Sequence, residues 1–416
     1  MNMALLAIFI PFAAIPILAL LGGTRVGRLF GVLVSLACWV VTLLVAWQGQ
    51  GAQGLIRPGP VQALFGAVAG FSGVAASLAI FMAPISLRPR LQQGALQAVI
   101  GASLVGLYEA HAPLLWLAME AGVMALACMS FAAGHRAAAL KTLVLGSVGA
   151  ELALFGSLLV LLAGVAGAQG DSLLPLALIL GVGGCFLQII AFSGVGPVPS
   201  IAAGALLNVP LLAVLRFRHV DQAVGGPLLL ALAVVVLLGV AFCLRRRQAP
   251  MQVLGLASLQ QAGVVLFAFG LGGVWALFAG MLHMLLTSLL KTGLFAGFSF
   301  ASASKQVVWL RAALLFALVG LPPSGLFVSE FIIVQQTYVL HPWLCVPLAL
   351  ALVGGAWPLL RWAQRVAGEK TVPTPWRQNG VACVLLAVPL ASMVLLAFAL
   401  PAPVAQILMQ AAKTWL

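Results

Sequence analysis

The chain has 416 residues, of which 63% are hydrophobic and only 6% are charged. A soluble globular protein of this length could not cover its surface with so few polar side chains, so the composition indicates an integral membrane protein. The formal net charge of +13 would suggest nucleic acid in a soluble protein, but here Lys and Arg lie mostly between apolar runs, where they orient membrane helices. We therefore expect a lipid bilayer and no nucleic-acid partner.

Apolar runs long enough to cross about 30 Å of hydrocarbon recur along the whole chain, and helices satisfy their own backbone in lipid. We expect an all-α integral membrane protein with fourteen spans in a single polytopic membrane domain, 1–416. The first run lacks a basic segment and a small-residue cleavage site, so we expect a membrane helix there rather than a removable signal. The predicted spans are 2–22, 29–47, 61–86, 92–108, 111–133, 138–166, 172–194, 197–215, 226–244, 251–272, 274–300, 310–340, 343–362 and 379–400.

The twelfth run, 310–340, is too long for one straight crossing. It contains Pro322 and Pro323, which cannot donate backbone hydrogen bonds, so a broken helix is expected. Residues 402–416, after the last run, are expected to form a short surface helix.

The positions of Lys and Arg between the runs predict the orientation, because the cytoplasmic side of a bacterial inner membrane holds most of them. The even-numbered loops contain three, Arg57, Arg216 and Arg218. We therefore expect odd-numbered loops in the cytoplasm and both termini in the periplasm. The odd-numbered loops contain Arg25, Arg28, Arg88, Arg90, Arg136, Arg245, Arg246, Arg247, Lys305, Arg311, Arg361, Arg365, Lys370 and Arg377.

Four charged residues fall deep inside predicted spans: Glu120, Glu151, Lys291 and Glu330. Each would cost about 2.5 to 3.5 kcal/mol near the bilayer centre if unpaired, so we expect all four to face the protein interior. Glu120 lies near the middle of the fifth span, where a carboxyl can hold and release a proton or merely join two helices. Glu330 follows the helix break, where freed backbone groups admit water and favour a titratable site.

His283 and Lys291 are eight residues apart on the eleventh span, which places them about 80° apart around a helix. Both can therefore line one polar seam and transfer protons along it. Two structural alternatives stay open: Lys291 as a buried counter-ion for Glu330 or Glu120, and His283 as a hydrogen-bonded interface residue.

Other intramembrane polar residues are accessory candidates, although hydrogen bonds between packed helices are the commoner use of such groups. For Glu151 and Lys141 a structural role is favoured, and Lys141 lies near enough to a span end to reach the interface. The accessory candidates are Lys141, Glu151, Gln188, Asn208, Gln260 and Gln261.

The six cysteines lie singly inside apolar runs without the spacing of metal or cluster ligands. The sequence also contains no flavin or quinone motif. We expect no catalytic residue, metal site or cofactor on this chain.

Four stretches together resemble the antiporter-like membrane subunits of respiratory complex I, membrane-bound nickel–iron hydrogenases and Mrp cation/proton antiporters. Within this family the sequence is most similar to component F of hydrogenase 4 and its relatives in formate hydrogenlyase. The resemblance covers essentially the whole chain. The stretches are "AHAPLLWLAMEA", "GPVPSIAAGALLNVPLLAVLRF", "LHMLLTSLLKTGLF" and "GLPPSGLFVSEFII".

The resemblance implies two inverted five-helix repeats, 91–216 and 226–362, between N-terminal helices in 1–90 and a C-terminal helix and tail in 363–416. It also implies broken seventh and twelfth helices. A proton path along the membrane midplane is implied as well. In the family this path consists of charged residues inside the spans, and Glu120, Lys291 and Glu330 match such positions on the fifth, eleventh and twelfth spans.

One family feature is missing from the first repeat. The sequence contains no Lys or Arg between Lys141 and Arg216, although relatives carry a Lys on the seventh span. Asn208 occupies an eighth-span position that is Lys in some relatives. The N-terminal half-channel is therefore expected to be degenerate.

Three functions are compatible with these residues. The leading hypothesis is a membrane subunit of a complex I-like or hydrogenase-like redox complex that conducts protons or sodium, with other membrane subunits and a soluble redox arm as partners. The second is a non-conducting scaffold for partner subunits. The third is a cation/proton antiporter or inorganic-carbon uptake subunit, which co-purifying subunits would distinguish from the first.

Overall fold

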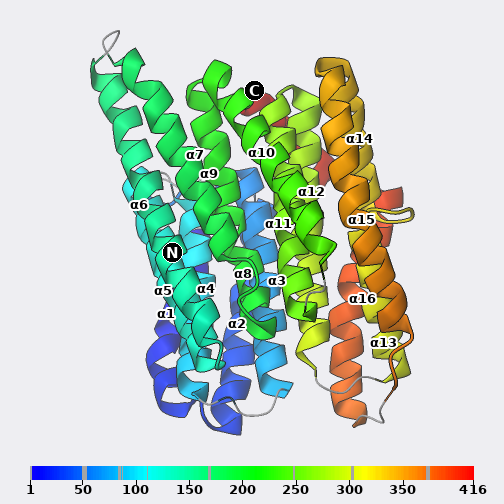
Figure 1. Cartoon of the computed structure of the whole chain (residues 1–416). Helices are drawn as coiled ribbons and strands as arrows, with labels where there is room; N and C mark the ends of the chain where they lie inside the picture. Colours follow the sequence, from blue (N-terminus) through cyan, green and yellow to red (C-terminus); the bar gives the residue numbers. More distant parts are fainter. Residues whose placement is uncertain are drawn as a thin grey trace. The chain divides into compact units, whose positions relative to one another are not determined.

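The computed structural model describes residues 2–48, 54–82, 86, 88–109, 111–166, 170–246, 249–300, 304–371 and 375–416. Within these residues every regular element is a helix, and the only strand-like pairing is an isolated bridge between Ile56 and Glu109. The expected all-α fold is therefore confirmed (Figure 1). The chain divides into two compact units, unit 1 (Met1–Gly225) and unit 2 (Gly226–Leu416).

The core of unit 1 contains α8 and α9, which are buried along nearly their whole length. α6 instead buries one face, where small residues such as Gly149 and Gly156 let the backbone of α7 approach closely. The elements of unit 1 are α1 (Met3–Leu21), α2 (Arg25–Gln48), α3 (Pro60–Met82), α4 (Pro89–Tyr108), α5 (Ala112–Ala132), α6 (Arg136–Ala166), η2 (Asp171–Leu173), α7 (Leu174–Ala191), α8 (Pro197–Leu206) and α9 (Asn208–Val220).

In unit 2, α12 is the central helix, packed against α11, α13, α14, α16 and α17. Almost every residue of α12 is buried, which explains why it carries no wide polar face. α10 (Gln222–Leu244) leads into this unit. Its other elements are α11 (Pro250–Leu271), α12 (Val274–Ser299), α13 (Lys305–Leu318), α14 (Gly325–Leu340), η3 (Pro342–Leu344), α15 (Cys345–Ala367), α16 (Trp376–Phe398) and α17 (Ala402–Thr414).

Each of the fourteen expected spans coincides with a helix or a helix pair, but the number of crossings is not confirmed. Twelve spans within the described residues are long and apolar enough to cross a membrane. α4 is not among them, and its first turns carry Gln92 and Gln93. α13 and α14 have only 14 and 16 residues. The C-terminal residues form the expected short helix, α17, which buries Leu408 and Ala412.

The predicted break in the twelfth run is confirmed, because α13 and α14 are separate helices with Pro322 and Pro323 between them. The break expected in the seventh helix is absent, since α7 is continuous over Leu174–Ala191. The interruption lies in the next span, at Leu207, between α8 and α9. Pro210 has no N–H to donate to the carbonyl of Leu206, so the helical bonding lapses at that point.

Three arginines that the sequence placed in loops are instead buried helical residues: Arg28 on α2, Arg218 on α9 and Arg311 on α13. The helices extend several residues beyond the purely apolar runs. Arg311 donates from Nε to the carbonyl of Gly297 at 2.9 Å and from Nη2 to that of Phe300 at 2.8 Å, so it satisfies the C-terminal end of α12.

Two further arginines were predicted in loops. Arg247 lies outside the described residues, as does the side chain of Arg377.

Candidate functional site: buried polar residues at the broken helix of unit 2

The buried helix α12 carries both polar residues predicted for the eleventh span. His283 is 0% exposed and Lys291 is 5% exposed. Lys291 Nζ donates a hydrogen bond to the backbone carbonyl of Ser258 on α11 at 3.1 Å. Both side chains thus form hydrogen bonds to the neighbouring helix α11.

His283 connects α12 to two other helices through both ring nitrogens. Nδ1 lies 2.9 Å from Oγ of Ser329 on α14, and Nε2 lies 2.6 Å from Oε1 of Gln261 on α11. Each distance is that of a hydrogen bond, so the imidazole has a fixed orientation.

Gln261 is held in turn by the broken helix. Its Nε2 donates to the carbonyl of Leu318, the last residue of α13, at 3.1 Å. In a continuous helix that carbonyl would accept from residue 322, which here is Pro322 and has no N–H. The proline pair therefore frees a backbone acceptor, and Gln261 satisfies it.

This network determines which atoms carry hydrogens. Because Gln261 presents its carbonyl oxygen, Nε2 of His283 must donate, and in the neutral imidazole Nδ1 accepts from the Ser329 hydroxyl. If Nδ1 also takes a proton, it donates to Ser329 Oγ, whose hydrogen can turn to the carbonyl of Leu326 at 2.9 Å. Both protonation states of His283 are therefore hydrogen-bonded without movement of a heavy atom.

Glu330 follows Ser329 on α14, and its carboxylate lies against the backbone of Gly320 in the break. A Cβ atom at Gly320 would come within 2.8 Å of the Glu330 carboxyl carbon, and Gly320 has a φ of +77°. Only glycine meets both requirements without strain.

Lys291 does not pair with Glu330. Within the described residues the only salt bridge joins Glu109 to Arg216, so Lys291 is not the counter-ion of this acid. Gln260 also points elsewhere, because its Nε2 donates to the carbonyl of Ala351 on α15 at 3.3 Å.

In unit 1, Glu120 has one specific partner. Its Oε1 accepts a hydrogen bond of 2.6 Å from the hydroxyl of Ser147 on α6, while the buried Oε2 has no hydrogen-bond partner among the described residues. One carboxyl oxygen is thus fixed by a hydrogen bond, and the other is buried without one among the described residues.

The other candidates of unit 1 mainly hold α6 and α7 together. Lys141 Nζ donates to the backbone carbonyls of Ile190 and Ser193, so it satisfies the C-terminal end of α7. Gln188 donates to the carbonyl of Gly146 at 3.4 Å. Asn208 is fully buried where α9 begins. Lys141 thus links α6 to the end of α7.

The expectation that Glu151 faces the interior of this chain is wrong. Its side chain is exposed near the middle of α6. The buried face of that helix is the stripe of small residues that includes Gly149, Ala150 and Ala153, which turns Glu151 away from the core of unit 1.

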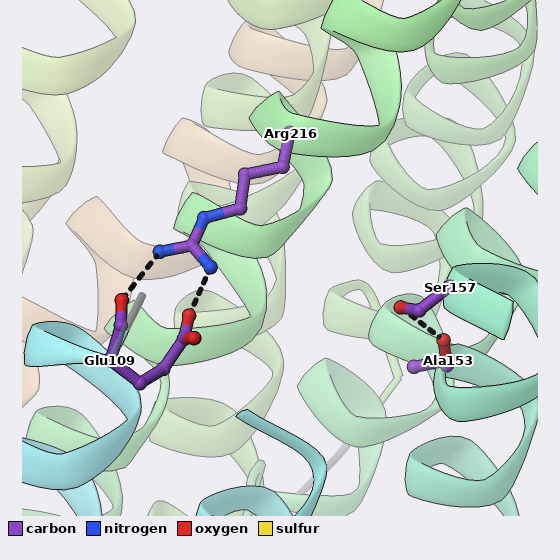
Figure 2. Close-up of polar contacts among 4 residues, drawn as sticks. All are labelled: Glu109, Ala153, Ser157 and Arg216. Atoms are coloured by element: carbon purple, nitrogen blue, oxygen red, sulfur yellow. Dashed lines mark hydrogen bonds and ion pairs between the residues drawn. The ribbon is translucent and has the colours of Figure 1, made fainter. Parts of the chain in front are cut away.

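Sequence reasoning missed one buried charge, Glu109, at the end of α4. Figure 2 shows the Arg216 guanidinium directed at both the carboxylate and the backbone carbonyl of Glu109. The Glu109 side chain is fully buried, and this burial raises its pKa above the usual value although Arg216 opposes the shift. Opposite charges at the ends of the fourth and eighth spans were the available signal, but Arg216 had been assigned to orientation alone.

The hydroxyl contacts of Ser147 and Ser329 and the backbone-carbonyl contact of Ser258 were also missed. Serines are common in membrane helices, so composition gives no reason to choose these three. The position of Ser329 beside Glu330 was the one usable signal.

Comparisons with known proteins give one sequence relative and several structures of the same fold. No family model matches the sequence. The chain is 30% identical over 265 residues to a "Hydrogenase-4 component F homolog" of Methylacidiphilum infernorum. That match covers 51% of this chain and 55% of the relative, so it spans about half the length of each protein.

The fold matches cover nearly the whole chain. A chain of the archaeal membrane-bound sulfane sulfur reductase superposes with a TM-score of 0.80 at 18% identity, covering 99% of this chain and 97% of the other. A chain of the Mrp complex from Dietzia also gives 0.80, at 16% identity, covering 98% of this chain and 52% of the other.

A third structure is a subunit of respiratory complex I from Thermus thermophilus. It superposes with a TM-score of 0.76 at 19% identity and covers 99% and 98% of the two chains. These matches agree with the resemblance read from the four sequence stretches. The chain therefore shares the fold of these membrane-complex chains over nearly its whole length, and it shares sequence with a hydrogenase-4 component F homologue over about half of it.

Proposed function

We propose that the chain is an ion-conducting membrane subunit of a complex I-like or hydrogenase-like redox complex, and that it moves protons through unit 2. The observation that carries this proposal is the setting of His283. Its two nitrogens contact Ser329 and Gln261, and these partners serve the imidazole in either protonation state. A group that keeps its hydrogen bonds while it gains and loses a proton is suited to a relay.

Glu330 and Lys291 are the other proposed members of the relay. Glu330 lies where the helix is broken, and such breaks are tolerated at membrane depth where they line a polar path. Lys291 contacts a backbone carbonyl, which accepts a hydrogen bond but does not take the proton. Transfer from Lys291 to His283 therefore requires a mobile carrier between them.

Unit 1 is proposed to be a degenerate half-channel. It retains Glu120. Its only Lys in the described membrane helices, Lys141, is hydrogen-bonded to backbone carbonyls at the end of α7. No Lys or Arg follows until Arg216. Energy for transport would come from redox chemistry in partner subunits, which include other membrane subunits and a soluble redox arm.

The proposed location is a bacterial inner membrane with both termini in the periplasm, which rests on the distribution of Lys and Arg between the spans. The exposed Glu151 is consistent with neighbouring membrane subunits, because a carboxylate at the middle of a membrane helix requires a polar partner.

The deciding experiment measures ion pumping by the intact complex in proteoliposomes. Glu330→Gln and Lys291→Ala are compared with wild type and with Glu369→Gln and Lys305→Ala, which remove the same charges at exposed positions. We expect the first two variants to lower pumping at least tenfold, by about 1.4 kcal/mol in the barrier or more, with the complex assembled and the controls unaffected.

A scaffold without ion conduction is the second candidate, favoured by the absence of a basic residue between Lys141 and Arg216. Normal pumping by assembled Glu330→Gln and Lys291→Ala complexes would replace the relay with this candidate. A cation/proton antiporter is the third candidate, and the fold similarity to a chain of an Mrp complex favours it. Co-purification with cation-antiporter subunits or a zinc-dependent partner instead of redox subunits would select that third function.

A further inference from the structure

A cavity of about 780 Å³ lies within unit 2 where α10 ends and α11 and α15 pass it. Its polar lining is almost entirely cationic. The charged residues around it are Arg245, Arg246, Arg361 and Arg365, and the aromatic residues are Trp357 and Trp362.

Within the described residues no carboxylate forms a salt bridge with any of these four arginines. All four side chains are exposed, and within the described residues the single salt bridge lies elsewhere, between Glu109 and Arg216. The acid nearest in sequence, Glu369, forms no salt bridge with them within the described residues. Four guanidinium groups around one cavity repel one another, so the cavity favours a bound anion.

Aromatic contacts hold two of the four guanidinium groups. The Arg361 guanidinium lies 4.8 Å from the ring centroid of Trp357, and that of Arg246 lies 5.2 Å from the ring of Phe242. Such stacking orients the planar group and leaves its N–H bonds available at the edge.

The depth of the cavity is indicated by its tryptophans. Trp side chains concentrate at the membrane–water interface, and Trp357 is exposed. Arg361 and Arg365 lie one and two turns farther along α15, about 6 and 12 Å from Trp357. The arginines therefore lie at the level of lipid headgroups, on the side that the Lys and Arg distribution predicts to be cytoplasmic.

We propose that this cavity binds the phosphate headgroup of an anionic phospholipid, with a two-phosphate lipid such as cardiolipin bound more tightly than singly charged phosphatidylglycerol. Guanidinium groups donate paired hydrogen bonds to phosphate, and four of them match a doubly charged headgroup better than a single phosphate. The volume is in the usual range for a specific small-molecule site. Basic pockets between membrane helices are a known physical solution for anionic lipids.

The test measures lipid retention by the purified full-length chain in detergent, using native mass spectrometry after addition of cardiolipin, phosphatidylglycerol or phosphatidylcholine. Arg361→Gln combined with Arg365→Gln should reduce cardiolipin retention by about tenfold or more, since each charged hydrogen bond is worth that much. The matched control is Arg25→Gln combined with Arg136→Gln, which removes two exposed arginines of unit 1 and should retain wild-type binding.

Several results would overturn the proposal. Equal retention of cardiolipin by the cavity variant and the control excludes the site, as does equal binding of phosphatidylcholine by wild type. Thermal protection by inorganic phosphate equal to that by cardiolipin assigns the cavity to a soluble anion. Loss of a partner subunit when the same variant is purified as the intact complex, with unchanged lipid binding, assigns it to an acidic partner. If the first variant does not fold, Arg245→Gln combined with Arg246→Gln tests the same cavity from the end of α10.

Discussion

His283 and Lys291 occupy the same buried helix, yet their surroundings are chemically different. His283 has a side-chain hydroxyl on one nitrogen and a side-chain amide on the other, whereas Lys291 contacts a backbone carbonyl. A hydroxyl can both donate and accept, so Ser329 can follow a change in protonation that a carbonyl cannot. The serine is therefore as important to the proposed relay as the titratable groups beside it.

Ser329→Ala tests this role of the hydroxyl. The substitution leaves Nδ1 of His283 without its buried partner, which should cost about 1 to 3 kcal/mol of stability and slow proton flux. Flux in proteoliposomes and thermal unfolding are measured together, and Ser329→Thr should restore flux because it restores the hydroxyl. Ser103→Ala is the control, since Ser103 is equally buried but bonds only to the helical carbonyl of Val99. Unchanged flux in the alanine variant would contradict the role.

Glu109 predicts a pH dependence of stability. Burial raises its pKa, so the unfolded chain releases this proton at a lower pH than the folded chain. The contribution of Glu109 to stability is therefore complete below about pH 4, the usual carboxyl value, and is lost as the pH rises through the raised pKa. As the pH rises over that range, the unfolding temperature of wild type should fall relative to that of Glu109→Gln. A rise in the unfolding temperature of wild type relative to the variant would mean that the ion pair with Arg216 affects the pKa of Glu109 more than burial does.

At the scale of the helix, the break between α13 and α14 positions the candidate site. The proline pair frees the Leu318 carbonyl for Gln261, and Gly320 provides the space that the Glu330 carboxylate occupies. Ser324 Oγ donates to the carbonyl of Ala317 at 3.2 Å and adds a further link across the interruption. These hydrogen bonds stabilise the break, and the break positions the side chains of Gln261 and Glu330.

Gly320→Ala tests whether the break positions Glu330. The added methyl group overlaps the carboxylate, and a left-handed backbone costs an alanine about 1 to 2 kcal/mol. We expect proton flux to fall toward that of Glu330→Gln although the acid is still present. The control is Gly239→Ala on α10, where an added Cβ meets nothing within 4 Å. Normal flux in an assembled Gly320→Ala complex would show that the position of Glu330 is not critical.

The same elements show how far sequence can predict this site. Apolar length located the helices, and Pro322 with Pro323 predicted the break, because both signals are local. The contacts of Lys291 with Ser258 and of His283 with Ser329 depend on how neighbouring helices are rotated and staggered, which no local pattern fixes. Glu151 was misplaced because its depth was considered without the stripe of small residues that defines the buried face of α6.

At the scale of the whole molecule, the main prediction is orientation. The odd-numbered loops hold most of the Lys and Arg, although Arg28 and Arg311, which were counted there, are buried in helices. If these two are left out of the count, the odd-numbered loops still contain more Lys and Arg than the even-numbered loops. The predicted orientation is therefore unchanged.

Cysteine labelling in intact cells measures this orientation. In a chain whose six native cysteines are replaced, Asp171→Cys should react with a membrane-impermeant maleimide, whereas Lys305→Cys should react only after the membrane is opened. Both positions are exposed, so access depends on the side of the membrane. The reverse labelling pattern would place the termini in the cytoplasm and invert the direction of any transport.

The hydrogen bond between Lys291 and Ser258 also has a consequence for biosynthesis. A helix with a lysine near its middle is inserted into lipid at a cost of about 2.5 to 3.5 kcal/mol when it enters alone. The acceptor for that lysine is on α11, the helix synthesised immediately before α12, and only a short turn at Gly272 and Gly273 separates them. We therefore expect α11 and α12 to leave the translocon as a preassembled hairpin, in which Lys291 is already hydrogen-bonded to Ser258 before it is exposed to lipid.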